Sequence, residues 1–151
     1  MITVEKADPS APDSLDLIEK LSAELAAITG DSGKRHFIPE SVQGERSLWV
    51  VARNKQGHAV GCGAIRPLAN DIAEVKRMFS DRSSAGIGNA LLTFLESSAK
   101  RMGYHALWLE TRRINRRAVE FYSKNGYSVI ENYGPYSGRD EAVCFAKNLQ
   151  G

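Results

Sequence analysis

The sequence predicts one α/β domain built on a mixed, mostly antiparallel sheet that is flanked by helices. The first observation is a succession of three strands, two of them joined by a tight turn at Asn54–Gly57. The second is a glycine-rich turn after these strands that opens a long amphipathic helix. The third is that the 151 residues contain no internal repeat, linker or low-complexity segment, and this length suits one hydrophobic core.

Strands are predicted where short apolar or alternating runs are bounded by turn residues. The predicted strands are Ile2–Lys6, Leu48–Arg53, His58–Pro67, Ile72–Phe79, Ala106–Glu110, Tyr127–Ile130 and Ala142–Lys147. Helices are predicted where apolar residues recur at intervals of three and four. The second predicted helix runs from Gly86 to Gly103, and the third runs from Asn115 to Gly126.

The first predicted helix follows a turn rich in proline and aspartate. Asp13 or Ser14 is expected to cap it, and Gly30 is expected to end it. Its expected apolar positions are Leu15, Ile18, Leu21, Leu25 and Ile28. The segment from Asp31 to Gly44 has no clear period, so it is expected to form a loop with one short helical turn, of the kind that often lines a substrate site.

Composition excludes several classes of protein. The chain is 42% hydrophobic and 25% charged, which is ordinary for a globular protein, and its net charge of +2 does not favour nucleic-acid binding. Neither a signal peptide nor an 18-residue apolar run is present, so a cytoplasmic protein without a membrane partner is expected. The two cysteines, Cys62 and Cys144, lack a metal-binding spacing and are expected to be buried free thiols.

The turn that opens the second helix reads Ser83-Ser84-Ala85-Gly86-Ile87-Gly88-Asn89-Ala90. A helix start presents backbone N–H groups without intrahelical partners and the positive end of the helix dipole, so it favours an anion such as a pyrophosphate. Gly86 and Gly88 remove the Cβ atoms that would keep a ligand from the backbone. The pattern is neither the dinucleotide fingerprint nor a P-loop, because the residues after Gly88 continue neither motif.

Three blocks follow one another along the chain: Ala73–Phe79, the turn and helix from Ser83, and Asn115–Tyr127. The third reads N-x-x-A-x-x-F-Y-x-x-x-G-Y. In this order and spacing the blocks resemble the GCN5-related N-acetyltransferase (GNAT) family, and the first is similar to the family's central strand. The resemblance extends over roughly the whole chain and is strongest from Ala73 to Tyr127.

This resemblance implies a sheet of about six or seven strands with about four helices and a splayed parallel strand pair that admits acetyl-CoA. It implies that the main chain of Met78 and Ser80 pairs with the pantetheine arm, and that N–H groups from Ser84 to Ala90 hold the pyrophosphate. No metal is expected. The expected cofactor-binding residues are Met78, Phe79, Ser80, Ser83, Ser84, Ala85, Gly86, Ile87, Gly88, Asn89, Ala90, Asn115, Arg116, Ala118, Phe121, Tyr122 and Lys124.

The turn departs from the family at one position. The family reads [QR]-x-x-G-x-[GA], whereas this chain has Ser83 at the first position and Arg82 one residue earlier. Either Arg82 reaches the phosphates by a small shift, or the backbone N–H groups suffice with a neutral hydrogen bond from Ser83. Asn115 can cap its helix alone or also bind the pantetheine. Arg116 and Lys124 can approach the 3′-phosphate or simply carry surface charge.

Two residues are expected to handle protons during acetyl transfer to an amine. Glu74, a carboxylate in an apolar strand, is the candidate general base, directly or through a water. The alternative is that Glu74 pairs with Lys76 or Arg77, or faces solvent. Tyr122, four residues before Gly126, matches the family's tyrosine and is the candidate general acid toward the thiolate of the coenzyme. The alternative is a core aromatic residue.

The acceptor site is expected where several segments border the cleft. Its candidate residues are Trp49, Arg66, Tyr133 and Tyr136. Aromatic walls can receive an amine through cation–π contact. The alternative is that Trp49 belongs to the core and the two tyrosines order a hairpin.

The resulting expectation is an N-acetyltransferase in which a primary amine of a small molecule attacks acetyl-CoA directly in a ternary complex. A covalent route through Cys62 or Cys144 is not expected, because neither has an activating neighbour in the sequence. The alternatives are a protein acetyltransferase that modifies lysine or an N-terminus, and a non-catalytic acyl-CoA-binding module. Family members often dimerise, so a homodimer is also considered.

Overall fold

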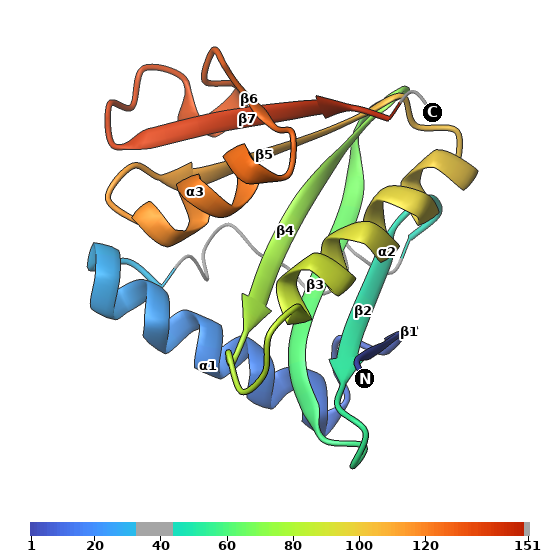
Figure 1. Cartoon of the computed structure of the whole chain (residues 1–151). Helices are drawn as coiled ribbons and strands as arrows, with labels where there is room; N and C mark the ends of the chain where they lie inside the picture. Colours follow the sequence, from blue (N-terminus) through green and yellow to red (C-terminus); the bar gives the residue numbers. More distant parts are fainter. Residues whose placement is uncertain (33–43, 150–151) are drawn as a thin grey trace.

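The computed structural model describes residues 1–32 and 44–149, and its elements follow the predicted order (Figure 1). The strands are β1 (Thr3–Lys6), β2 (Leu48–Arg53), β3 (Ala59–Ala69), β4 (Ile72–Ser80), β5 (Ala106–Arg112), β6 (Ser128–Ile130) and β7 (Ala142–Asn148). The helices are α1 (Pro12–Thr29), α2 (Ile87–Arg101) and α3 (Arg116–Lys124), with a short 3₁₀ helix, η3 (Gly134–Tyr136). Most of the segment from Asp31 to Gly44, with its expected helical turn, lies outside the described residues.

The strands form one seven-stranded sheet in the order β1-β2-β3-β4-β5-β7-β6. Neighbours β4 and β5 are parallel, and every other neighbouring pair in this sheet is antiparallel. The prediction of a mixed, mostly antiparallel sheet is therefore confirmed. The described residues contain three α-helices, fewer than the resemblance implies.

The parallel pair β4–β5 separates soon after it begins. Pairing joins Ile72 to Ala106 and ends where Glu74 pairs with Trp108, although both strands continue well beyond these positions. Figure 1 shows the two strands diverging from one end of the molecule. This divergence confirms the splayed parallel pair and leaves an opening inside the sheet.

A bulge in β4 lies beside this opening. The register between β3 and β4 shifts between Cys62 and Ala64, and Arg77 takes a positive φ of 56° in the bulged strand. The carbonyl of Arg77 accepts a hydrogen bond from the Cys62 thiol at 3.3 Å. A Cβ at Gly63 would lie 2.6 Å from the sulfur of Met78 and 3.1 Å from Cδ1 of Leu95, so a larger residue there would require these side chains to shift.

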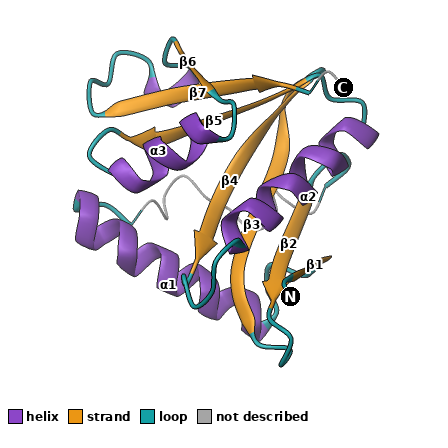
Figure 2. Ribbon diagram, viewed as in Figure 1, coloured by secondary structure: helices purple, strands orange, loops and turns teal. Residues whose placement is uncertain are grey.

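Alternate residues of the central strands pack against helices on opposite faces of the sheet. Trp49 and Val51 of β2 belong to a buried cluster with Leu17 of α1. Val50 and Ala52 belong to a second cluster, which also holds the apolar sides of α2 and α3. The helix α1 thus covers one face, and α2 with α3 covers the other, which is the near side in Figure 2.

The start of α1 differs from the prediction, whereas its end agrees with it. The N-cap is Ala11, without a side-chain hydrogen bond, and neither Asp13 nor Ser14 caps the helix. With the helix beginning at Pro12, Leu17 is fully buried and Leu15 is 48% exposed, so Leu15 does not belong to the apolar face. Gly30 ends the helix in the left-handed conformation, as predicted.

Candidate active site

A cavity of about 660 Å³ lies where β4 and β5 separate. Its walls come from the second half of β4, the end of β5, the start of α2, part of α3 and the C-terminal half of α1. Because strand pairing has ended there, side chains from both faces of the sheet reach the same space. The expected cofactor-binding residues that line it are Met78, Phe79, Ser80, Ser84, Ala85, Gly86, Ile87, Gly88, Asn89, Asn115, Ala118, Phe121 and Tyr122.

One wall of the cavity is the edge of β4 that faces β5. Residues from Val75 to Ser80 line the cavity, and on this side β4 has no strand partner after Glu74. An exposed strand edge offers alternating N–H and C=O groups, with which an extended polar chain can pair as an added strand does. A pantetheine arm, which carries two amide groups, fits such an edge.

The turn before α2 forms the second wall. Gly86 is the N-cap of α2 with a φ of 86°, a conformation that favours glycine, and no atom would contact a Cβ there. The first turn of α2 contains no acidic residue. Open N–H groups and the positive end of the helix dipole therefore face the cavity, which suits a pyrophosphate.

Gly88 has a packing role in addition to the coenzyme-binding role that the sequence predicts. A Cβ at Gly88 would lie 3.1 Å from Cε1 of Phe121 on α3. The small residue therefore allows α3 to pack closely against the first turn of α2. Gly88 lines the cavity, and its contact with Phe121 limits the size of the residue at this position.

Four expected cofactor residues do not line the cavity: Ser83, Ala90, Arg116 and Lys124. The Ser83 hydroxyl donates a hydrogen bond to Asp81 Oδ1 at 2.6 Å, so it serves the turn itself. The others point away because each helical residue turns by about 100° from its neighbour. On α3 this rotation brings Arg117, rather than Arg116, into the cavity lining.

Arg82 supplies a positive charge beside the turn. Its backbone has a positive φ of 60°, its side chain lines the cavity, and its Nη1 atom lies 2.9 Å from Oε1 of Glu24 on α1. This ion pair is partly exposed, so it is easily exchanged for another anion. Of the two explanations for the departure at Ser83, the geometry favours a cation at Arg82.

Replacing Arg82 with alanine is expected to weaken acetyl-CoA binding roughly tenfold, because one charge-assisted contact to a phosphate is lost. Glu24→Gln should strengthen binding, because the competing carboxylate is removed. Calorimetric titration of acetyl-CoA measures both effects. Arg101→Ala, at the opposite end of α2, is the matched control. Unchanged affinity in Arg82→Ala would mean that the backbone N–H groups hold the pyrophosphate without this cation.

Asn115 is the N-cap of α3 and also lines the cavity. Its Oδ1 atom accepts a hydrogen bond from the backbone N–H of Ala118 at 3.3 Å. The capping interpretation of Asn115 is therefore confirmed. The side chain lies where it can also meet a ligand, and that second role stays a prediction.

Tyr122 reaches the cavity from α3. It is 6% exposed, and its ring packs against Phe121 and Tyr127 with centroid distances of 5.1 and 5.5 Å. Its hydroxyl has no hydrogen-bond partner among the described residues. Burial raises the pKa of Tyr122 above its ordinary value of 10.0, so the phenol is protonated at neutral pH and can donate a proton.

Glu74 lines the cavity, and two side chains hold its carboxylate. It is only 1% exposed, and its Oε1 atom accepts a hydrogen bond from Arg66 Nε at 2.9 Å and lies 2.9 Å from Arg66 Nη2 in the same ion pair. Its Oε2 atom accepts a hydrogen bond from the Tyr133 hydroxyl at 2.7 Å. Burial and the nearby Glu74 carboxylate raise the pKa of Tyr133, which keeps this donor protonated. These contacts favour an anchoring role, and the assignment of Glu74 as base stays a prediction.

The four expected acceptor residues lie in three places. Tyr136 lines the cavity, whereas Arg66 and Tyr133 lie behind Glu74 and hold it. Trp49 does not border the cavity: it is 1% exposed, and its Nε1 atom donates to Ser14 Oγ at 2.8 Å. The reason is its place in β2, two strands from the opening, under the N-terminal half of α1.

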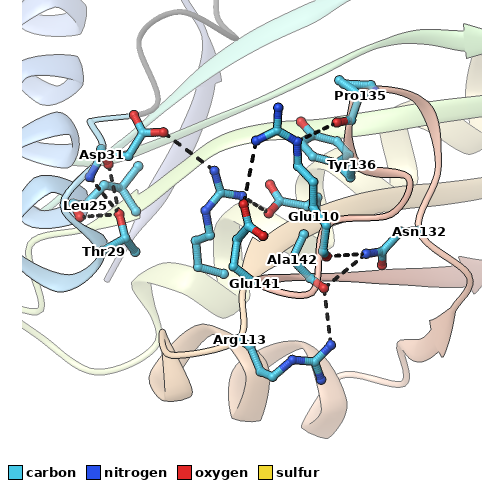
Figure 3. Close-up of polar contacts among 12 residues, drawn as sticks. Leu25, Thr29, Asp31, Glu110, Arg113, Asn132, Pro135, Tyr136, Glu141 and Ala142 are labelled. Carbon is cyan, nitrogen blue, oxygen red and sulfur yellow. Dashed lines mark hydrogen bonds and ion pairs between the residues drawn. The ribbon is translucent and has the colours of Figure 1, made fainter.

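Glu110, near the end of β5, lines the cavity but was not among the residues predicted from the sequence. Its carboxylate accepts a hydrogen bond from Arg112 Nη1 at 2.6 Å. Arg112 also faces Asp31, just after α1, with 3.6 Å between Nη2 and Oδ2. Figure 3 shows Asp31 and Glu110 among the polar contacts of this region. Burial raises the pKa of Glu110 above its ordinary value of 4.5, and the charge of Arg112 opposes this shift.

A signal for Glu110 was present in the sequence. Trp108, Glu110 and Arg112 alternate along β5 with Leu107, Leu109 and Thr111, so they share one face of the strand. The strand also lies between the glycine turn and the Asn115 block, where the cleft was expected. Further residues that line the cavity and were not predicted include Leu21, Leu25, Ile28, Thr111 and Arg117.

The described residues fit acetyl-CoA. The α2 turn with Arg82 suits the pyrophosphate, and the β4 edge suits the pantetheine amides. Glu110 and Tyr122 reach the cavity from opposite faces of the sheet. Tyr122 packs with α2 and α3, whereas Arg112, the partner of Glu110, faces Asp31 just after α1. A thioester placed in the opening would thus lie between a carboxylate and a phenol.

Residues 15–127 match the model of the acetyltransferase (GNAT) family. The chain therefore belongs to the GNAT family, and the fold described above is the GNAT fold. It is an N-acetyltransferase that uses acetyl-CoA. Within residues 1–32 and 44–149, no helix combines the length and apolar character needed to cross a membrane.

Similar proteins cover nearly the whole chain. An IAA acetyltransferase from Azospirillum brasilense is 29% identical over 147 residues, which is 95% of each chain. A Klebsiella pneumoniae subsp. pneumoniae structure described as an acyl-CoA N-acyltransferase superposes with a TM-score of 0.84 at 28% identity, over 99% of both chains. A GNAT family acetyltransferase from Elizabethkingia anophelis with acetyl-CoA bound has a TM-score of 0.70 at 15% identity, over 97% of both chains.

Proposed function

We propose that this enzyme transfers the acetyl group of acetyl-CoA to a primary amine of a small molecule by direct attack in a ternary complex. The observation that carries the proposal is one cavity that combines a coenzyme-binding turn and strand edge with Glu110 and Tyr122. A neutral amine and the thioester can therefore meet in a single space, with a proton acceptor and a proton donor at its walls.

The proposed step forms one bond and breaks another. The amine nitrogen attacks the carbonyl carbon of the thioester, its proton passes to Glu110 directly or through a water, and the carbon–sulfur bond breaks. Tyr122 donates its proton to the departing sulfur. The raised pKa of Glu110 makes it a better base near neutral pH than an exposed carboxylate, and the raised pKa of Tyr122 keeps its proton in place.

An acetyl-cysteine intermediate has no support in the geometry. Both thiols are buried, and burial raises the pKa of Cys62 to about 12 and also raises that of Cys144. Neither thiol is therefore a thiolate at neutral pH, and the thiolate is the nucleophilic form. Direct transfer is the simpler proposal.

A small acceptor is favoured over a protein by the segments that border the cavity. Tyr136, in the loop between β6 and β7, is 4% exposed and lines the cavity, while α1 lines it from the other side. A peptide needs an open groove, which these segments narrow. The name of the Azospirillum brasilense relative, an IAA acetyltransferase, also supports a small acceptor.

The test combines calorimetric titration of acetyl-CoA with mass-spectrometric detection of acetylated products from amino acids, polyamines, aminoglycosides and peptides. Acetylation of small amines at rates above those of peptides is the expected result. Preferred turnover of peptides would favour the protein acetyltransferase. Binding of acetyl-CoA without turnover of any acceptor would favour the non-catalytic module.

A further inference from the structure

Lys76 is a cation inside the cavity for which the proposed reaction has no use. Its side chain is 13% exposed and lines the cavity from β4. Its Nζ atom donates a hydrogen bond to the Tyr136 hydroxyl at 3.2 Å and lies 3.9 Å from Glu74 Oε1. An ammonium group has three N–H donors, so these contacts within the described residues leave it under-satisfied.

The two glutamates around Lys76 already have closer cationic partners. Glu74 is held by Arg66 at 2.9 Å, and Glu110 is held by Arg112 at 2.6 Å. Burial also lowers the pKa of Lys76, although the charges of Glu74 and Glu110 oppose this shift. The nearest carboxylate oxygen given for Lys76, Glu74 Oε1 at 3.9 Å, is shared with Arg66, so this partly desolvated ammonium gains from an anion brought by a ligand.

Lys76 and Glu110 lie on opposite sides of the opening. The last paired positions of the two strands are Glu74 and Trp108, and Lys76 and Glu110 each lie two residues beyond them. Strand alternation keeps each on the same face as the paired residue before it. The cavity thus has the Lys76 ammonium on its β4 side, beside a Glu74 carboxylate that Arg66 holds, and the Glu110 carboxylate on its β5 side.

Arg112 does not change this polarity. It lies between two carboxylates, Glu110 at 2.6 Å and Asp31 at 3.6 Å, so its charge is already opposed from both sides. The cavity therefore offers separated charges of opposite sign rather than a net charge of one sign. A ligand with its own separated charges complements this pattern better than a simple amine does.

We propose that the acceptor is an amino acid, whose carboxylate binds the Lys76 ammonium while its amine lies toward Glu110. This proposal rests on the proposed function and specifies its substrate class. The carboxylate would take the N–H donors of Lys76 that point into the cavity, and the amine would be held at the side where its proton is removed. A carboxylate in this position fixes the orientation of the acceptor before attack.

The experiment compares amino acids with the amines that remain when the carboxylate is removed: leucine with isoamylamine, phenylalanine with phenethylamine, and lysine with cadaverine. The wild-type enzyme is expected to have the higher kcat/KM for the amino acid of the best pair. In Lys76→Met, the KM of that amino acid should rise roughly ten- to hundredfold, because one charge-assisted hydrogen bond to its carboxylate is lost. The KM of the matching amine and of acetyl-CoA should not change.

Lys55→Met, in the exposed turn between β2 and β3, is the matched control and should leave both acceptors unaffected. A second measurement needs no variant. Carboxylic acids without an amine, 3-phenylpropionate and 4-methylpentanoate, should inhibit the wild-type enzyme competitively with the acceptor. This arm keeps the proposal testable if Lys76→Met does not fold.

Equal turnover of amino acids and amines, without inhibition by the acids, would refute the carboxylate subsite and leave the N-acetyltransferase proposal intact. If no small amine is acetylated, the proposed function fails instead. The subsite is then decided by calorimetry of 3-phenylpropionate with the CoA-bound enzyme. Binding in the wild type that is lost in Lys76→Met supports the subsite, and absence of binding overturns it.

Discussion

Replacing Glu110 with glutamine is expected to lower kcat/KM at pH 7 by roughly 10²–10³-fold, the range typical for loss of a general base. The wild-type activity should fall as pH decreases through the raised pKa of Glu110, because the protonated carboxyl no longer accepts the proton of the amine. In Glu110→Gln the rate should instead depend on the fraction of neutral amine and recover as pH approaches the amine pKa. Steady-state kinetics across pH for both proteins measures this difference.

Glu74→Gln separates the two candidate bases. Glu74 is anchored by Arg66 and Tyr133, so its replacement is expected to lower the free energy of unfolding and to leave the shape of the pH profile unchanged. If the decrease in activity at low pH is altered in Glu74→Gln but unchanged in Glu110→Gln, the base is Glu74. Denaturant unfolding of both variants completes the comparison.

Tyr122→Phe is the second large expected effect, a decrease in kcat of roughly 10²-fold, because the departing thiolate loses its proton donor. The free energy of unfolding should change little, since the Tyr122 hydroxyl has no hydrogen-bond partner among the described residues. Pre-steady-state kinetics with acetyl-CoA and a good acceptor measures the chemical step, and thermal unfolding measures stability.

Tyr127→Phe is the matched control for this substitution. Tyr127 packs against Tyr122, is 4% exposed, and donates a hydrogen bond from its hydroxyl to Glu96 at 2.8 Å. Its loss should cost about 1 kcal/mol of stability or more without slowing transfer. A wild-type rate in Tyr122→Phe would leave Tyr122 with a packing role only.

Local patterns predicted most of the fold. Gly30 and Gly86 mark the end of one helix and the start of another. These glycines, and the alternation of apolar and polar residues in the strands, are signals that lie within a few neighbouring residues. The start of α1 differs from the prediction because Asp13 and Ser14 are good caps in isolation, whereas the helix begins at Pro12 and the Ser14 hydroxyl accepts a hydrogen bond from Trp49. Tertiary contacts outweighed the local preference there.

The local structures proposed to hold the coenzyme were predictable for the same reason, because the turn at Gly86 and the Asn115 cap each depend on neighbouring residues. The acceptor half depends on contacts between residues far apart in the sequence. Tyr133 meets Glu74 across 59 positions, and Lys76 meets Tyr136 across 60. The sequence neighbourhood of Tyr133 and Tyr136 does not indicate these partners, so the surroundings of Glu74 and Lys76 became visible only in the folded arrangement.

The separation of β4 from β5 also has a thermodynamic consequence. The free protein keeps backbone N–H and C=O groups of two central strands without partners in the ladder, at a position where most sheets are continuous. Acetyl-CoA that pairs with the β4 edge would complete hydrogen bonding that the polypeptide leaves open. Binding and folding are then linked, and coenzyme at about 100 times its Kd should add about 2.7 kcal/mol to the stability of the native state.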